Sequence, residues 1–169
     1  MTFTPDSPEE QPENWHWRDG PVTPGRAVVF DMDGVLSDAS RRQHYLDWPY
    51  RDWEAFFAAC GDDDPIAEVA RLLDCLDSEL TILLLTARPL RVRPQTLGWL
   101  DRYKLRWDAL IMRGWDDHGS SRLFKQRVVR EFRSYGFDLA LAFEDDRRNW
   151  EMFHGEGVPC VYIHSGYYD

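Results

Sequence analysis

Five short apolar runs follow residue 26, and polar residues end each of them. They are residues 27–30, 81–85, 109–112, 139–143 and 158–163. Short runs with little polar alternation are typical of strands that are buried on both faces of a parallel sheet. The pattern therefore predicts five strands that belong to one sheet.

The stretches between these runs place apolar residues three and four positions apart, which is the spacing of one helix face. They are residues 65–76, 94–103, 121–132 and 149–154. Strands that alternate with helices form βαβ units, in which helices cover both faces of a parallel sheet. We therefore expect an α/β fold with three α/β/α layers around a central parallel sheet.

Residues 1–25 lack this pattern. Several prolines interrupt any helix there: Pro5, Pro8, Pro12, Pro21 and Pro24. The composition favours a flexible N-terminal tail, followed by a single domain over residues 26–169. Trp15 and Trp17 are unusual in a linker, and we expect them to dock on the domain or on a partner.

Polar side chains stand where the predicted strands end. Ligands of open α/β sheets bind beyond the carboxyl ends of the strands. The positions at the ends of the first four apolar runs are Asp31, Thr86, Met112–Arg113 and Glu144–Asp145. Hydroxyl or carboxylate groups follow three of these runs, so this edge of the sheet is the candidate site.

The stretch V-V-F-D-M-D-G-V-L-S-D, residues 28–38, ends a predicted strand with two carboxylates, Asp31 and Asp33. Side chains two positions apart in an ideal strand point to the same face. Two such carboxylates repel each other, and burying either one is costly without a partner of opposite charge. We therefore expect a positive charge beside them.

Four motifs resemble those of a known superfamily. They are F-D-M-D-G-V-L at 30–36, L-L-L-T-A-R at 83–88, Lys125 within a helix and F-E-D-D at 143–146. In this order they resemble the motifs of the haloacid dehalogenase (HAD) superfamily of phosphotransferases, over residues 26–165. The resemblance implies a HAD-like Rossmannoid fold and a phosphatase that works through an aspartyl-phosphate.

The resemblance also implies a role for each motif residue. Asp31 would be the nucleophile. Asp33 would protonate the leaving oxygen and later take a proton from water. Thr86 would hydrogen-bond a phosphate oxygen, and Lys125 would pair with Asp31 and the phosphate. Gly34 permits the tight turn after the strand and is a candidate substrate-binding residue.

The resemblance further implies Mg²⁺ as cofactor. The expected ligands are Asp31, the backbone carbonyl of Asp33 and Asp145, because oxygen donors suit a small hard cation. The cation would supply the missing positive charge and would offset charge on the transferring phosphoryl group. The run from Glu144 to Asp146 allows two registers for the acidic pair. We favour Glu144–Asp145, because Glu144 directly follows the strand, and we place Asp146 outside the site.

The C-terminal part, residues 144–169, resembles the 3′-phosphatase half of bacteriophage-type polynucleotide kinase. It shares an acidic pair, Glu-Met-aromatic, Gly-Val-x-Cys and a final Ser-Gly-aromatic sequence. Arg42 and Arg88 fall where that family has phosphate-contacting arginines, which supply bidentate donors. Ser121 and Glu144 depart from that family, which has an acidic residue and Asp at these positions. The sequence has no G-x-x-x-x-G-K-[ST] loop, so we expect no kinase half.

The segment available for a cap, residues 36–61, is short and has room for about one helix. A minimal cap leaves a site open to a polymer end or a protein, whereas larger lids are usual in small-metabolite enzymes of the superfamily. The aromatic residues of this segment form either a base-stacking platform or core under a helix, and we favour core. They are Trp48, Tyr50, Trp53, Phe56 and Phe57.

Charge and composition limit the kinds of partner that the protein is expected to bind. The net charge of −10 argues against broad binding of duplex nucleic acid, but it leaves open one end held in an Arg-lined pocket. No apolar run approaches the roughly 20 residues of a membrane span, and the acidic N-terminus lacks a secretory signal. Cys60, Cys75 and Cys160 fit reduced core thiols of a cytoplasmic protein better than disulfides or a zinc site.

Our leading hypothesis is an Mg²⁺-dependent hydrolase that removes a 3′-phosphate from nucleic-acid ends or nucleotides. One alternative is a HAD phosphatase of a small phosphorylated metabolite. Another is a non-catalytic HAD-fold module that binds a partner through its Trp-rich tail, although the intact Asp31, Asp33, Thr86 and Lys125 speak against it. A separate kinase or repair protein is a candidate partner, and the oligomeric state is left open.

Overall fold

The computed structural model describes residues 11–169. Within that range, six strands form one sheet in the order β1-β6-β5-β2-β7-β8. Their bounds are β1 Trp15–Trp17, β2 Arg26–Phe30, β5 Thr81–Pro89, β6 Ala109–Arg113, β7 Asp138–Glu144 and β8 Cys160–Tyr162. Neighbouring strands are parallel except for β1, which is antiparallel to β6. The predicted α/β fold with a largely parallel central sheet is confirmed.

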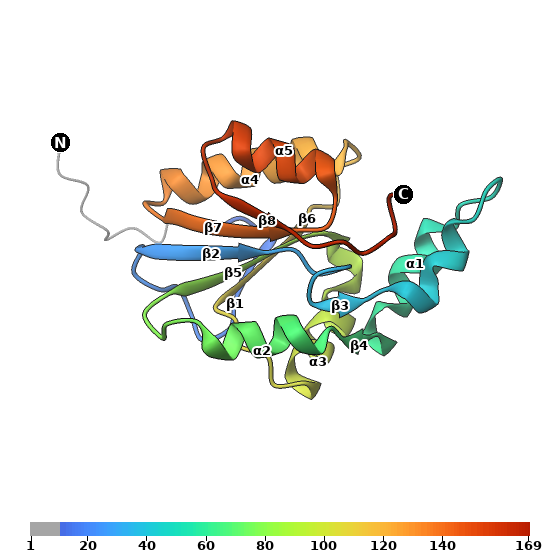
Figure 1. Cartoon of the computed structure of the whole chain (residues 1–169), viewed down its shortest axis with the longest axis horizontal. Helices are drawn as coiled ribbons and strands as arrows, with labels where there is room; N and C mark the ends of the chain where they lie inside the picture. Colours follow the sequence, from blue (N-terminus) through green and yellow to red (C-terminus); the bar gives the residue numbers. More distant parts are fainter. Residues whose placement is uncertain (1–10) are drawn as a thin grey trace.

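Helices cover both faces of the sheet and complete three layers (Figure 1). Helices α2 (Ala67–Cys75) and α3 (Arg93–Arg102) lie on one face, and α4 (Ser121–Ser134) and α5 (Arg147–Gly155) lie on the other. These are the four predicted helices, with ends shifted by a few residues. No helix in the described part of the chain is long and apolar enough to cross a lipid bilayer.

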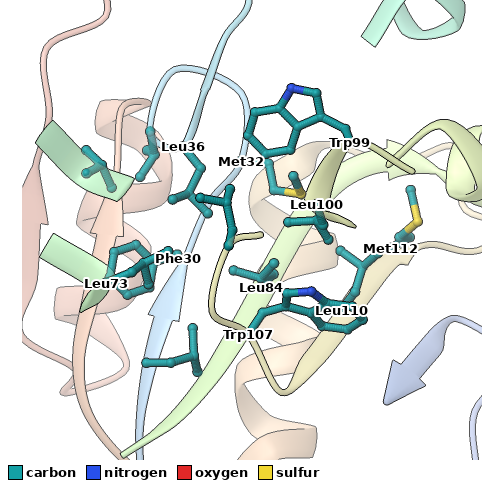
Figure 2. Close-up of a cluster of buried hydrophobic side chains, with 14 of the residues drawn as sticks. Phe30, Met32, Leu36, Leu73, Leu84, Trp99, Leu100, Trp107, Leu110 and Met112 are labelled. Carbon is teal, nitrogen blue, oxygen red and sulfur yellow. The ribbon is translucent and has the colours of Figure 1, made fainter. Parts of the chain in front are cut away.

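Alternating side chains along β2 divide the core between the two helical layers. Val28 and Phe30 pack in one cluster with Leu73 of α2 and Trp99 of α3 (Figure 2). Val29 packs in the other cluster, which includes residues of α4 and α5. Burial on both faces explains why the run is continuously apolar, and it fixes the end of β2 where the first candidate carboxylate follows.

The N-terminal segment Trp15–Trp17 is an edge strand. It pairs with β6 as β1, and Trp15 is buried with its ring centroid 5.1 Å from that of Phe132 in α4. The prediction of a flexible tail is therefore wrong for this segment, and of the two docking alternatives it contacts the domain itself. Residues 1–10, also part of the predicted tail, lie outside the described residues.

The expected small cap is an insertion between two short strands. β3 (Ser37–Asp38) and β4 (Asp64–Pro65) pair antiparallel at its base. Between them lie three short helices: η1 Ser40–Leu46, α1 Trp53–Ala58 and η2 Ala59–Asp62. Figure 1 shows that the insertion projects beyond the end of the sheet at which β2 terminates.

The aromatic residues of the insertion do not form one buried stripe. Phe56 is buried, but Trp48 and Tyr50 are 86% and 88% exposed, and Trp53 is 48% exposed. The interpretation of these residues as core is therefore wrong for Trp48, Tyr50 and Trp53. Trp48 and Tyr50 lie in the segment that connects η1 to α1, and this segment is not the helix under which the sequence predicts them to pack.

The three cysteines are free thiols. Cys60 and Cys160 are buried, in agreement with the prediction of core thiols, and burial raises the pKa of Cys160 to about 12. Cys75 is exposed at the end of α2, so the core prediction is wrong for this residue.

Candidate active site

The turn after β2 separates the two carboxylates of the first motif. The Asp31 N–H donates to the Phe143 carbonyl at 3.1 Å, which continues the contact with β7 beyond the end of β2. The chain then turns back, and the Met32 carbonyl accepts from the Ser37 N–H at 2.9 Å. As a result Asp31 and Asp33 reach different positively charged partners instead of sharing one.

Gly34, in this turn, lies against the side chains of Asp145 and Ser165. Its φ of +82° lies in the left-handed region, which favours glycine. A Cβ at this position would lie 2.1 Å from Oδ2 of Asp145 and 3.0 Å from Cβ of Ser165. The turn therefore needs glycine for its backbone conformation and also for the approach of the Asp145 carboxylate.

Three carboxylates gather at the ends of two adjacent strands. Asp31 follows β2, Glu144 is the last residue of β7 and Asp145 follows it, and one oxygen of each carboxylate lies within 4.8 Å of the others. Lys125 of α4 adds a buried ammonium, with Nζ 2.9 Å from Oδ1 of Asp31 and in an ion pair with Glu144. The structure thus brings together four predicted site residues from three separate motifs.

Electrostatics in this acidic cluster favour a bound cation. Burial and the charge of Asp31 raise the pKa of both Glu144 and Asp145, to about 8 and about 9. Burial lowers the pKa of Lys125, but Asp31 and Glu144 outweigh it and raise that pKa above its ordinary value. When all three carboxylates are ionised, they and the one ammonium leave a formal charge of −2. Both side-chain oxygens of Asp145 are buried without a hydrogen-bond partner in the described chain, so these residues fit a divalent cation with oxygen ligands.

Asp146 has a separate structural role. Its side chain caps α5 by accepting from the Arg148 N–H at 2.9 Å, and it also pairs with the Arg148 guanidinium at 2.9 Å. It is absent from the three-carboxylate cluster within the described residues. This placement agrees with our choice of Glu144–Asp145 as the acidic pair.

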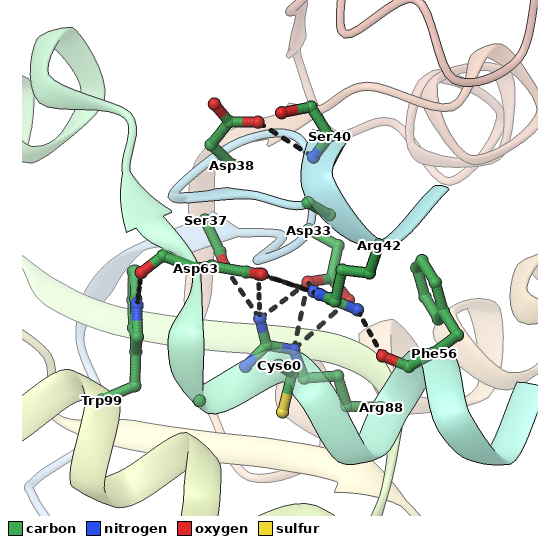
Figure 3. Close-up of polar contacts among 12 residues, drawn as sticks. Asp33, Ser37, Asp38, Ser40, Arg42, Phe56, Cys60, Asp63, Arg88 and Trp99 are labelled. Atoms are coloured by element: carbon green, nitrogen blue, oxygen red, sulfur yellow. Dashed lines mark hydrogen bonds and ion pairs between the residues drawn. The ribbon is translucent and has the colours of Figure 1, made fainter. Parts of the chain in front are cut away.

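Asp33 lies in a second charged cluster, between the sheet and the insertion (Figure 3). Arg88 donates to Oδ1 of Asp33 from Nη2 at 2.6 Å and from Nε at 3.1 Å. Arg42 of η1 also donates to Oδ1 through Nη2. Burial alone would raise the pKa of Asp33, but the charges of Arg88 and Arg42 outweigh it and hold that pKa at about 2.

Sequence reasoning missed Asp63, a buried carboxylate in the same cluster. Asp63 accepts from Nε and Nη2 of Arg42 at 2.8 and 2.7 Å, and from the Ser37 hydroxyl at 2.5 Å. Its carbonyl accepts from the Trp99 indole at 2.8 Å. The surrounding sequence D-D-D at 62–64 reads as an exposed acidic turn. The only available signal was that a buried arginine requires a buried partner of opposite charge.

A comparison with known families identifies the domain. The sequence model of one HAD family, the polynucleotide kinase PNKP phosphatase domain, matches residues 25–168. The chain belongs to this family. The protein is therefore a HAD phosphatase, which is a phosphoric monoester hydrolase.

Solved structures share the fold at low sequence identity. A chain of the Pnkp1/Rnl/Hen1 RNA repair complex is 23% identical, with a TM-score of 0.71 over 88% of this chain and 45% of its own length. A second Pnkp1/Rnl/Hen1 structure is 24% identical, with a TM-score of 0.70 over 90% of this chain and 50% of its own length. The present chain thus spans about half the length of both.

A class C acid phosphatase from Bacillus anthracis with tungstate bound has the same fold. It is 16% identical, with a TM-score of 0.61, and the match covers 89% of this chain and 70% of that one. No curated protein matches the sequence.

Thr86 of this PNKP-family phosphatase is buried within β5 and does not follow it. The strand continues to Pro89 because its pairing with β6 shifts register between Leu85 and Pro89. The Thr86 Oγ1 accepts from the Arg88 N–H at 3.1 Å, which leaves the hydroxyl hydrogen able to donate.

Arg42 and Arg88 are more enclosed than sequence reasoning suggested for phosphate-binding residues of this phosphatase. Their exposed fractions are 2% and 0%, and most of their donors are engaged by protein groups. Arg42 also donates to the Phe56 carbonyl at 3.0 Å, and Arg88 donates to the Thr96 hydroxyl at 3.2 Å. Direct contact with phosphate therefore stays a prediction for both.

Ser121, where the sequence departs from the bacteriophage-type pattern, is the first residue of α4. Its hydroxyl accepts from Nδ2 of Asn149 in α5 at 3.2 Å. Where the bacteriophage-type family has an acidic residue, this chain therefore has a neutral contact between α4 and α5. The departure leaves Lys125, one turn further along α4, in place beside Asp31.

Proposed function

We propose that this HAD phosphatase removes the 3′-phosphate from a nucleic-acid end or a nucleotide. The observation that carries the proposal is the match of residues 25–168 to the phosphatase domain of polynucleotide kinase PNKP. The relatives in an RNA repair complex support the same substrate class and make a separate kinase or repair protein a candidate partner.

The reaction has two chemical steps on this chain's own residues. A carboxylate oxygen of Asp31 bonds to phosphorus while the bond to the leaving oxygen breaks, and Asp33 gives that oxygen a proton. Water then attacks the aspartyl-phosphate and loses a proton to Asp33, which releases phosphate and restores Asp31. Lys125, 2.9 Å from Asp31, offsets negative charge at the attacking carboxylate, and the Thr86 hydroxyl donates to a phosphate oxygen.

Proton transfer by Asp33 depends on the substrate. In the resting site the two arginines hold the pKa of Asp33 at about 2, so the carboxylate is ionised. A phosphoryl group brings further negative charge, and a nearby like charge favours the neutral form of a carboxyl group. Asp33 therefore takes up its proton when substrate is bound.

The acidic cluster is the proposed Mg²⁺ site. Asp31 and Asp145, supported by Glu144, would hold the ion together with the backbone carbonyl of Asp33, and their hard oxygen atoms suit Mg²⁺. When bound, Mg²⁺ supplies positive charge that offsets the charge of the transferring phosphoryl group.

The shape of the insertion supports a polymer end over a small metabolite. Its three helices are short, and its exposed Trp48 and Tyr50 offer flat rings for unpaired bases. A lid that encloses a small metabolite would instead bury its aromatic side chains over the substrate.

A substrate panel with Mg²⁺ or with EDTA tests the proposal. The panel holds a 3′-phosphorylated oligonucleotide, its 5′-phosphorylated counterpart, sugar phosphates and p-nitrophenyl phosphate. We expect the 3′-phosphorylated oligonucleotide to have the highest kcat/KM and EDTA to abolish hydrolysis. Preference for a sugar phosphate would support the metabolite alternative, and no metal-dependent release from any substrate would support a binding module.

A substitution at the nucleophile tests the aspartyl-phosphate. Asp31→Asn should abolish hydrolysis of every substrate because a neutral amide does not form the intermediate. Asp138→Asn, at an exposed position at the start of β7, is the matched control and should keep full activity. Activity of Asp31→Asn near that of the control would refute the mechanism.

A further inference from the structure

Asp63 lies where the insertion returns to the sheet, directly before β4, and its side chain is 2% exposed. Arg42 lies near the start of the same insertion, in η1. Two hydrogen bonds from Arg42, at 2.8 and 2.7 Å, join these points around one carboxylate. Asp63 therefore holds Arg42 by a two-point contact of the kind that fixes the plane of a guanidinium.

The two arginines do not depend equally on Asp63. Arg88 is also held by the hydroxyls of Ser37 and Thr96, at 3.0 and 3.2 Å. Outside the two carboxylates, Arg42 has the Phe56 carbonyl at 3.0 Å and the face of the Phe56 ring, 4.4 Å from its guanidinium carbon. Neither of these contacts fixes the orientation of the guanidinium plane as a two-point contact with a carboxylate does.

The guanidinium contacts fall unevenly on the two oxygens of Asp33. Oδ1 accepts from Arg42 Nη2 and from both Nη2 and Nε of Arg88. Oδ2 has a single long contact, 3.2 Å from Arg88 Nε. A proton on Oδ2 therefore leaves the contacts of Oδ1 intact, whereas a proton on Oδ1 would displace donors.

We propose that Asp63 is a positioning residue for proton transfer: by holding Arg42 on Oδ1 of Asp33, it reserves Oδ2 as the atom that carries the proton. The inference rests on the proposed role of Asp33 as acid and base, and it does not depend on which phosphate ester is the substrate. When Asp63 loses its charge, Arg42 and Arg88 share one carboxylate. Their guanidinium groups then repel each other, and the fixed arrangement around Asp33 is lost.

The test compares leaving groups. Asp63→Asn preserves the shape of the side chain but removes its charge and one acceptor oxygen. The p-nitrophenolate leaving group departs as an anion and gains little from a proton donor, whereas the alkoxide of an alkyl phosphate depends on one. The measured quantity is kcat/KM, which reports the step in which the leaving group departs.

We expect Asp63→Asn to lower kcat/KM for a simple alkyl phosphate by about 100-fold, within the range of acid catalysis, and for p-nitrophenyl phosphate by less than about threefold. Asp64→Asn is the matched control, because this neighbour is exposed and pairs with Arg41, and we expect no change. If Asp63→Asn fails to fold, Asp63→Glu serves instead: it keeps the charge but displaces the two oxygens that hold Arg42, and it should show the same selective loss.

The outcomes separate this inference from the proposed function. Equal losses for both esters would mean that Asp63 is only structural, and unchanged kinetics would mean that Arg42 needs no second carboxylate. Either result overturns the inference. If the wild type hydrolyses alkyl and aryl phosphates but not a 3′-phosphorylated oligonucleotide, the proposed substrate fails and the Asp63 test still stands. If the wild type hydrolyses no phosphate ester, both fail.

Discussion

Gly34→Ala separates two demands on one glycine. The first is the left-handed backbone, with φ of +82°. The second is the approach of Asp145, whose Oδ2 would lie 2.1 Å from the new Cβ. Gly20 isolates the first demand, because it has φ of +91° and a Cβ added there would meet no atom within 4 Å. Gly20→Ala is therefore the matched control.

The expected magnitudes follow from these distances. Left-handed backbone costs a residue with a Cβ about 1–2 kcal/mol, so both variants should lose about 2–8 °C in Tm. Contacts of a real Cβ essentially never fall below 3.0 Å, so at Gly34 the Asp145 carboxylate must move by about 0.9 Å, the difference between 3.0 and 2.1 Å. A displacement of about 1 Å in a catalytic group can cost about 100-fold in rate.

The assay is hydrolysis of p-nitrophenyl phosphate over a range of Mg²⁺ concentrations, together with thermal unfolding. Gly34→Ala should lower kcat/KM by about 100-fold and require more Mg²⁺, while Gly20→Ala should keep wild-type kinetics. If the two variants differ by less than about threefold in kcat/KM at equal loss of Tm, the position of Asp145 does not govern catalysis. The assignment of Asp145 to the metal site would then be wrong.

Two further predictions follow from the charges and the exposed rings. Because the pKa values of Glu144 and Asp145 are raised, to about 8 and about 9, their protonated forms stabilise the metal-free fold at low pH. The Tm in EDTA should therefore fall as the pH rises from about 4 toward about 9. A Tm that rises over this range would contradict the assignment of Glu144 and Asp145 to the metal site. So would a fall in Tm that saturating Mg²⁺ leaves unchanged. Trp48→Ala combined with Tyr50→Ala should raise the KM for a 3′-phosphorylated oligonucleotide, because each stacked base loses about 1–3 kcal/mol of binding free energy. The KM for p-nitrophenyl phosphate should stay unchanged. Equal effects on both substrates would exclude stacking.

The strands and the acidic cluster could be predicted because both follow from local patterns. An apolar run that ends in a carboxylate places that carboxylate at the carboxyl edge of a parallel sheet. Asp31 follows β2, and Glu144 and Asp145 stand at the end of β7, its neighbour in the sheet order, so their meeting is a consequence of topology. Lys125 required the family resemblance as well, because a lysine within a helix is ordinarily exposed.

The features that were missed depend on tertiary contacts that leave no periodic signal. β1 has three residues and lies in a proline-rich segment, so its pairing with β6 has no counterpart in the local pattern. The sequence predicts Trp48 and Tyr50 in the core because their rings are apolar, but an apolar ring gives no information about whether it faces the core or the solvent. Asp63 is one of three successive aspartates, and only its tertiary contacts, above all those with Arg42 and Arg88, distinguish it from its neighbours.

The two charged clusters divide the work of the site by their charge. Asp33 and Asp63 balance Arg42 and Arg88, so this cluster is neutral before any ligand arrives. Above the raised pKa values of Glu144 and Asp145, the cluster around Asp31 has a formal charge of −2, and a phosphate dianion that approaches it meets repulsion of about 4 kcal/mol for each pair of unit charges at 4 Å. The arginines offer little net charge against this repulsion, because their own carboxylates already neutralise them. A divalent cation bound in the acidic cluster removes the repulsion at its source. The arginine cluster is then left to orient Asp33, which is why we assign proton transfer to one cluster and charge neutralisation to the other.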